Sequence, residues 1–144
     1  MESEEDDYSI ELNRVQKNIK LFLAKVASQK GVVSYSDLCR GVALPYSMAN
    51  PDHRNQLAED LGRVSEEELC WYERPMLTCV VVDKNTMMPG KGFFDLAQDL
   101  YDIKIEDRMM FLAEEMRDTH EFWSSVDGKK EIARLEKEIA SFIS

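Results

Sequence analysis

Apolar residues recur at steps of three and four near the start of the chain, which is the spacing of one face of an α-helix. They are Leu12, Val15, Ile19, Phe22, Leu23 and Val26. The pattern predicts a long helix from about Ser9 to Lys30. Ser9 is a residue type that caps helix starts, and Gly31 is the type that ends helices in the left-handed conformation.

Capping patterns predict three shorter helices in the next part of the chain. In Ser34–Asp37 the serine hydroxyl can accept from the aspartate amide while the aspartate side chain reaches back, so a short helix follows. Asp52 can cap a second helix, whose inner face carries Leu57, Leu61 and Val64. Ser65–Glu68 repeats the capping box and predicts a third helix that ends before Pro75.

One continuous β-branched run, Leu77–Val82, is the strongest strand signal, and its lack of alternation indicates burial on both faces. The turn-rich segment Asp83–Gly92 leads from it into a helix from Phe93 to about Tyr101. Two amphipathic helices complete the chain, and the first closes at Asp127–Gly128. Its apolar stripe is Met109, Leu112, Ala113, Met116, His120 and Trp123. The stripe of the last helix is Ile132, Leu135, Ile139 and Phe142.

The predicted fold is therefore mainly α with a small β element. With a brief extended return in the loop, the first part has the order of a winged helix, in which three helices pack beside a small hairpin. We expect an acidic flexible N-terminus over residues 1–8 and a single domain over residues 9–144. That domain would consist of a winged-helix-like core (9–101) and a C-terminal helical pair (102–144).

The composition is that of an ordinary globular protein, with 44% hydrophobic residues, 32% charged residues and a net charge of −10. Five acids precede Tyr8 and predict a solvated terminus, with an acidic arm for a basic partner as the alternative. The sequence shows neither a basic-plus-apolar leader nor an apolar run of about 18 residues, so we expect no membrane partner. Cys39, Cys70 and Cys79 are odd in number and lie beside apolar residues, which favours reduced, buried thiols in a cytoplasmic protein.

Patterns for catalysis and metal binding are missing from the sequence. The two histidines, His53 and His120, lack ligand spacing, so we predict no metal and no cofactor. Pro89–Gly92 precedes a helix and can approach a phosphate, but Phe93 stands where a P-loop needs serine or threonine, which favours a plain turn. Cys79 has no histidine beside it to act as a base. The sequence therefore predicts a non-enzymatic protein without catalytic residues.

Apolar residues around Pro75 and in the following turn are candidates for binding a partner. They are Trp71, Tyr72, Met76, Met87 and Met88. Methionine side chains adapt well to partner surfaces. The alternative is that the two methionines of the turn fold back as a lid over the helix that begins at Phe93.

Nucleic acid would be the usual partner of a winged helix, and the candidate contacts are Arg54, Arg63, Lys84 and Lys91. However, the basic and acidic residues between Lys30 and Arg63 balance, in a chain whose net charge is −10. Because duplex binding depends on neutralising phosphates, this balance disfavours a nucleic-acid partner.

The stretch from Gly31 to Tyr101 resembles a group of small bacterial and phage proteins. The segments that carry the resemblance are Val33–Leu38, Leu57–Ser65, Arg74–Val82 and Pro89–Phe94. The run Pro-Gly-Lys-Gly-Phe-Phe after the valine-rich segment is the most specific part. The resemblance implies a winged-helix-like fold and carries over no catalytic residue.

The same stretch distantly resembles the winged-helix domain of DNA alkyltransferases and alkyltransferase-like proteins. The reactive segment of that family reads Pro-Cys-His-Arg-Val, and the comparable run here is Thr78-Cys79-Val80-Val81-Val82. The cysteine is present, but valines replace the histidine that would activate it and the arginine that would enter DNA. The resemblance therefore implies a shared fold without that family's mechanism.

These features rank three functions. The leading hypothesis is a non-catalytic protein-interaction module of inhibitor, immunity or adaptor type in a bacterial or phage system. Its partner would be another protein or a second copy of the chain. A homodimer through Met116–Trp123 or Leu135–Phe142 is compatible with all three functions. The first alternative is a winged-helix nucleic-acid-binding regulator. The second is an enzyme whose site forms only in three dimensions, around Cys79, His53 or His120.

Overall fold

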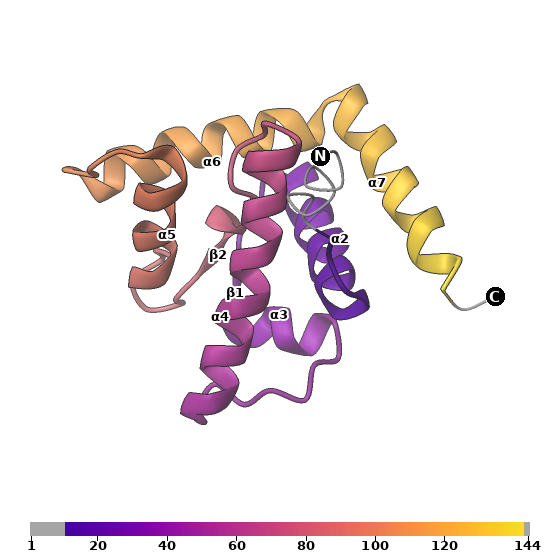
Figure 1. Ribbon diagram of the computed structural model, residues 1–144, viewed down its shortest axis with the longest axis horizontal. Helices are drawn as coiled ribbons and strands as arrows, with labels where there is room; N and C mark the ends of the chain where they lie inside the picture. Colours follow the sequence, from indigo (N-terminus) through magenta and orange to yellow (C-terminus); the bar gives the residue numbers. More distant parts are fainter. Residues whose placement is uncertain (1–10, 143–144) are drawn as a thin grey trace, which may run out of the picture.

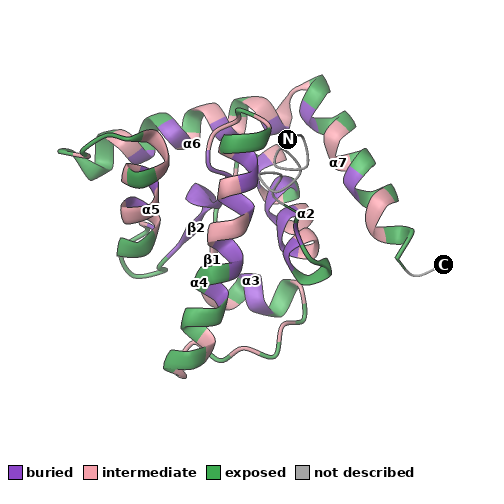
Figure 2. Ribbon diagram, viewed as in Figure 1, coloured by how far each residue is buried: buried purple, intermediate pink, exposed green. Residues whose placement is uncertain are grey.

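Helix α2 (Arg14–Ser28) is the element against which the other long helices pack, and the structure, a computed structural model, describes residues 11–142. Helices α4 (Pro51–Glu66), α6 (Arg108–Ser124) and α7 (Val126–Ala140) each contact it (Figure 1). The apolar side chains that α2 buries completely are Ile19, Leu23, Ala24 and Ala27. In Figure 2 the buried residues are concentrated in α2, β2 and parts of α4, while α7 is largely exposed or half-buried. The predicted acidic terminus, residues 1–8, lies outside the described residues.

Helix α2 begins later than predicted, because Asn13 provides its cap. The Asn13 side chain accepts a hydrogen bond from the Gln16 amide at 2.8 Å, and the Gln16 side chain accepts one from the Asn13 amide at 3.1 Å. This reciprocal pair satisfies amides that would otherwise lack partners at the helix start. The predicted cap, Ser9, lies outside the described residues. At the other end Lys30 has the left-handed conformation, with φ of 57°, so the prediction for Gly31 was wrong.

Two further caps lie at or near their predicted positions. Ser34 caps helix α3 (Tyr35–Gly41) by accepting from the Asp37 amide at 3.1 Å, as predicted. The Asp37 side chain does not reach back but pairs with an arginine of its own helix. Helix α4 is capped by Asn50 rather than by Asp52, since Asn50 accepts from the Asp52 amide at 2.9 Å. A proline occupies the first position of α4, where the missing amide costs nothing.

The predicted helix start at Ser65–Glu68 is wrong. Helix α4 instead continues without a break into a π-helical turn, η1 (Glu67–Trp71). Ser65 is buried, and its hydroxyl bonds the Thr78 hydroxyl at 2.5 Å. A capping serine has to face the amides that follow it, so the inward direction of Ser65 explains why no new helix begins there.

The π-helical turn brings two glutamates to one buried ammonium. Lys20 is 0% exposed, and its Nζ lies 2.6 Å from Glu67 Oε1 and 2.9 Å from Glu68 Oε2. Glu68 also accepts a bidentate pair from Arg74, at 3.0 and 2.8 Å. The Tyr72 ring lies 4.5 Å from Lys20 Nζ and 4.2 Å from Arg74 Cζ. We call Lys20, Glu67, Glu68, Tyr72 and Arg74 the Lys20 cluster.

Helix α7 buries few side chains completely, and ion pairs join it to this cluster and to α2. Glu131 pairs with Arg74 at 3.3 Å, and Glu138 pairs with Lys17 of α2. The hydrogen bond from Lys17 lowers the pKa of the Glu138 carboxyl.

The Leu77–Val82 run is buried, as predicted, but only its end is extended. Leu77–Val80 forms a 3₁₀ turn, η2, and the strand β2 (Val81–Val82) follows it. The reason is that polar side chains of neighbouring helices bind this segment. The Met76 amide donates to Glu115 at 2.8 Å, and two side chains within the turn are bonded by residues of α4 and α6.

Strand β2 pairs in parallel with β1 (Val33–Ser34), with Val81 opposite Val33 and Val82 opposite Ser34. No other strand occurs in residues 11–142, and the predicted mainly α fold with a small β element is confirmed. The loop after β2 consists of turns, so the hairpin predicted there does not form in the described chain. The assignment as a winged helix stays a prediction.

Helix α5 (Lys91–Tyr101) lies where a helix was predicted, but α6 is rotated relative to the prediction. Met109 is 72% exposed, whereas Glu115 and Thr119 are buried beside the apolar residues of α6. The inner face includes these two polar residues because both have partners near η2, the Met76 amide and the Cys79 thiol.

Ser125 separates α6 from α7, so the predicted break at Asp127–Gly128 was wrong. The Ser125 hydroxyl caps α7 by accepting from the Gly128 amide at 3.1 Å. A Cβ atom at Gly128 would lie 2.2 Å from the Phe122 carbonyl oxygen and 2.6 Å from Trp123 Cα. The close approach of the two helices therefore requires glycine at this position.

We expect opposite effects when two helical glycines are replaced by alanine. Gly128→Ala forces a Cβ against backbone atoms and should lower the free energy of unfolding by about 1–3 kcal/mol. Gly62 lies inside α4, and the nearest atom to a new Cβ there is 3.8 Å away. Gly62→Ala should therefore raise the free energy of unfolding by about 0.5–1 kcal/mol, because glycine is the weaker helix former. Urea unfolding followed by circular dichroism measures both values. A gain for Gly128→Ala would contradict the close helix contact.

The Lys20 cluster predicts a large difference between two lysine substitutions. Lys20→Met leaves two buried glutamates without their shared cation and should lower the free energy of unfolding by about 3–5 kcal/mol. Lys25→Met is the matched control, because it removes an exposed pair with Glu136 and should cost about 0–1 kcal/mol. Urea unfolding compares the two variants, and equal losses would show that the buried ammonium has no special role.

Candidate functional site

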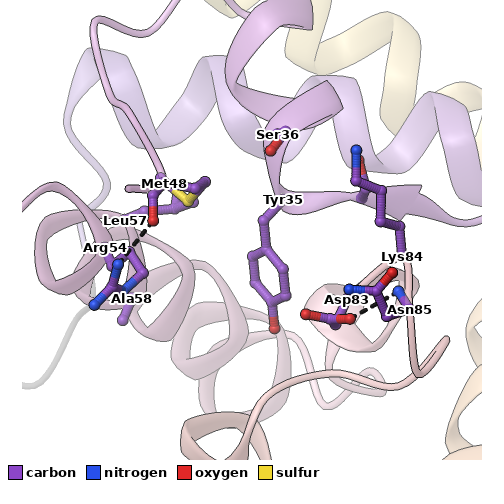
Figure 3. Close-up of a pocket in the computed structure, with 10 residues that line it drawn as sticks. Tyr35, Ser36, Met48, Arg54, Leu57, Ala58, Asp83, Lys84 and Asn85 are labelled. Carbon is purple, nitrogen blue, oxygen red and sulfur yellow. Dashed lines mark hydrogen bonds between the residues drawn. The ribbon is translucent and has the colours of Figure 1, made fainter. Parts of the chain in front are cut away.

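A cavity of about 350 Å³ lies where the start of α3, the first half of α4 and the loop after β2 meet. Figure 3 shows Arg54 and Leu57 on one side of it, Asp83 and Lys84 on the other, and Tyr35 between them. One wall is therefore a helix, and the other is the turn that follows the buried strand.

A second cavity of about 320 Å³ borders the first and shares Tyr35 and Ala58 with it. Its lining is mostly apolar and includes Leu61, Phe93 and Leu96 together with Gly62, Gly90 and Gly92. We call the two cavities and the two residues they share the Tyr35 groove. The groove has a polar end at Arg54 and Lys84 and an apolar end between α4 and α5.

Tyr35 is held in place where it divides the groove. It follows β1 directly and begins α3, and its hydroxyl accepts a hydrogen bond from the Gly90 amide at 2.8 Å. Burial raises the pKa of this hydroxyl, so it stays protonated at neutral pH. The hydrogen bond joins the start of α3 to the loop that forms one wall, which fixes that wall relative to α3.

The polar end of the groove contains more donors than acceptors. Arg54 Nη1 donates to the Met48 carbonyl oxygen at 2.8 Å, which leaves the other N–H groups of Arg54 uncommitted. Asp83 Oδ1 accepts from the amides of Asn85 and Thr86, at 2.8 and 3.2 Å, and so closes the turn. Within residues 11–142 the Lys84 ammonium has neither an ion pair nor a hydrogen bond.

Glycines keep the apolar end of the groove open. The nearest atom to a Cβ placed at Gly62 is Leu96 Cδ2 at 3.8 Å, and a Cβ at Gly92 meets nothing within 4 Å. Neither glycine has a positive φ. Gly62 also weakens α4 by about 0.5–1 kcal/mol relative to alanine. Neither backbone conformation nor packing requires glycine at these two positions. The effect of the two glycines is that the space beside them stays open.

The four predicted nucleic-acid contacts fall into two pairs. Arg54 and Lys84 line the same cavity of the Tyr35 groove. Arg63 instead pairs with Glu66 at 3.0 Å, and Lys91 pairs with Asp95 at 2.7 Å. Two of the four cations are thus neutralised by acids of their own helices, and these two are less able to bind phosphates.

The predicted partner-binding residues are distributed over several parts of the molecule. Trp71 is 56% exposed and lines, with Tyr72, a separate cavity beside α2 and α7. Met87 is also exposed, so the lid alternative is wrong for it, whereas Met88 is partly buried against the core. Met76 is completely buried, so its proposed contact with a partner is wrong. It is buried because the 3₁₀ turn that follows it lies inside the core.

The two helical faces proposed for a homodimer are partly used inside the molecule. In the Met116–Trp123 face, Trp123 is buried, and in the Leu135–Phe142 face, Leu135 is buried. Phe142 is exposed at the end of α7. Neither face is therefore a continuous exposed apolar surface.

The residues considered for catalysis each bind a different part of the fold. The Cys79 thiol donates to Thr119 Oγ1 at 3.4 Å, and burial raises its pKa to about 12. His120 Nε2 bonds the Gly31 carbonyl oxygen at 2.9 Å, and His53 Nδ1 accepts from the Ser47 amide at 2.9 Å. The structure therefore does not bring these three residues together into one site.

Residues 11–142 contain no group of three or more His, Cys, Asp or Glu side chains that could hold a metal ion. Among the same residues, no helix combines the length and apolar character needed to cross a membrane.

Sequence reasoning missed three features of the groove: Tyr35 as its divider, and Gly62 and Gly92 in its walls. Tyr35 was assigned only to a helix start, because its partner Gly90 is distant in sequence. Gly62 did carry a usable signal, since a glycine in the middle of a predicted helix weakens that helix without forming a turn.

Thiol accessibility gives a direct test of the catalytic residues. Cys70 is exposed, contrary to the prediction of three buried thiols, whereas Cys39 and Cys79 are buried. Burial also raises the pKa of both buried thiols. We expect iodoacetamide to modify the native chain once, at Cys70, and to reach the other two only after unfolding, as read by peptide mass spectrometry. Rapid modification of Cys79 in the native protein would restore it as a candidate nucleophile.

Comparison with known proteins does not assign a function to this chain. The predicted resemblance to small bacterial and phage proteins, and the distant one to alkyltransferase-like domains, remain predictions. No protein-family model, no curated protein and no solved structure matches this chain.

Proposed function

We propose that the protein is a non-catalytic interaction module that binds a segment of another protein in the Tyr35 groove. The observation that carries the proposal is the groove itself, which combines a largely apolar lining with uncommitted donors at one end. Binding sites of this kind are concave and mostly apolar, with a few polar groups that orient the ligand.

The contacts that anchor the walls of the groove support the same function. Its helical wall belongs to α4, which the Lys20 cluster holds at one end, and its second wall is bonded to Tyr35. A site that is formed before binding loses less conformational entropy when a ligand enters. The groove can therefore bind a flexible segment whose own ordering costs free energy.

A protein segment is preferred over duplex nucleic acid because the cationic surface is small. Arg54 and Lys84 lie on opposite sides of one cavity, and the other two candidate cations are paired with acids. A duplex ligand needs many phosphate contacts along a surface. An inhibitor, immunity or adaptor role in a bacterial or phage system is part of the same proposal.

The proposal is tested by blocking the groove. A displayed library of random twelve-residue peptides is selected on the wild-type protein, and the enriched peptides are measured against Gly62→Leu by fluorescence anisotropy. We expect Gly62→Leu to weaken binding by at least about tenfold, because the leucine occupies the space that the ligand requires.

The matched control is Asn55→Leu, which adds the same apolar side chain to an exposed position of α4 outside both cavities. Its affinity should equal that of the wild-type protein. If the library yields no peptide whose binding distinguishes Gly62→Leu from Asn55→Leu, the groove is not the binding site and the proposal is wrong.

A further inference from the structure

The donors of the first cavity specify the chemistry of its ligand. Lys84 has no partner within residues 11–142, and Arg54 commits one N–H group to the Met48 carbonyl oxygen. The carboxylate of Asp83 is the opposing charge, and one of its oxygens already accepts two backbone amides of its own turn. The groups left to a ligand are therefore mostly cationic donors, and they favour a ligand group that accepts hydrogen bonds and carries negative charge.

The second cavity specifies a different group. It is lined mostly by apolar side chains and by glycines, and a Cβ atom placed at Gly92 would have no neighbouring atom within 4 Å. Apolar surface that enters such a cavity leaves water, which is favourable in proportion to the area buried. A bulky aliphatic or aromatic side chain fits this requirement.

From these two ends we infer that the Tyr35 groove binds an extended peptide segment that carries an Asp or Glu side chain for Arg54 and Lys84 and a bulky apolar side chain for the Gly62–Gly92 cavity. The inference rests on the proposed function and names the partner chemistry of that same site. The peptide crosses Tyr35, so the two side chains must point to the same face, which residues at alternate positions of an extended chain do.

The charge of the whole molecule makes this preference specific. The chain carries a net charge of −10, so an acidic segment is repelled by most of the surface. The polar end of the groove is a place where two cations outnumber the one acid that lines the same cavity. An acidic segment is therefore attracted at this position, although the net charge of the molecule repels it.

The test uses a synthetic set of capped eight-residue peptides on an Ala/Gly background. Each peptide carries Asp, Asn, Lys or phosphoserine at one position and Leu, Trp or Ala one to four residues away. We expect the wild-type protein to prefer Asp over Asn and Leu or Trp over Ala, each by about tenfold or more. Binding should weaken as salt is added, since the preference for Asp is electrostatic.

Lys84→Gln is the informative variant, because Lys84 has no partner within the described chain and its loss should leave the fold intact. We expect it to remove most of the preference for Asp over Asn while keeping the preference for Leu over Ala. Gly62→Leu should do the reverse. Lys91→Gln is the matched control, since it makes the same change in charge at a lysine paired with Asp95 and should leave both preferences unchanged.

The outcomes separate this inference from the proposed function. Peptides that bind the groove without preferring Asp over Asn would overturn the inference and leave the proposed function standing. Peptide binding that Gly62→Leu does not reduce would overturn both. Tighter binding of phosphoserine peptides or of duplex DNA, if lost in Lys84→Gln, would show that the cations bind a phosphate. That outcome overturns the inference of an Asp or Glu side chain. Self-association that Lys84→Gln abolishes would make a second copy the occupant, which also overturns the inference.

Discussion

A buried ammonium group determines how the helices of this protein meet. Lys20 is inaccessible to water on the inner face of α2, and an unpaired charge in that position would cost several kcal/mol. Glu67 and Glu68 therefore have to reach it from the end of α4. This requirement explains why α4 does not stop at Ser65 but continues into a π-helical turn. Arg74 then binds the same glutamate as Lys20 does and directs the chain back into the core.

The position of the Tyr35 groove follows from the same cluster. Helix α4 provides one wall of the groove with its first half and middle, and Glu67 and Glu68 fix its C-terminal end. The segment after Arg74 enters the core as η2 and β2. The loop after β2 is the other wall, and the bond between Gly90 and Tyr35 holds it. The helical wall is thus anchored by the Lys20 cluster, and the loop wall by a hydrogen bond to Tyr35. Neither of these anchors joins α4 to the loop directly, so the space between the two walls can remain open.

The positions of most helices could be predicted from apolar spacing, but their rotation could not. The stripe predicted for α2 includes Val15, whereas the buried face contains Gln16 and Lys20 instead. Gln16 is buried because its side-chain Nε2 donates a hydrogen bond to Asp60 of α4 at 3.1 Å. A polar side chain is stable inside the protein only when a partner meets it, and that partner is remote in sequence. Glu115 of α6 is buried for the same reason, through the Met76 amide. A prediction from the spacing of apolar residues places such buried polar residues on the exposed face of the helix.

The site was harder to predict than the fold because residues of the same type have different surroundings at the groove. These differences decide which cations are available to a ligand and which glycines leave space for one. Summed charge treats Arg54, Arg63, Lys84 and Lys91 alike, and their sum with nearby acids disfavours any anionic partner. The structure separates them, since acids of the same helix neutralise Arg63 and Lys91 while Lys84 has no partner in the described chain. In the same way, Gly128 is required by contact with Phe122, whereas Gly62 is required by nothing around it. A residue that weakens its helix without serving the packing points to a role in binding, and the remaining cations lie along the groove that this residue leaves open.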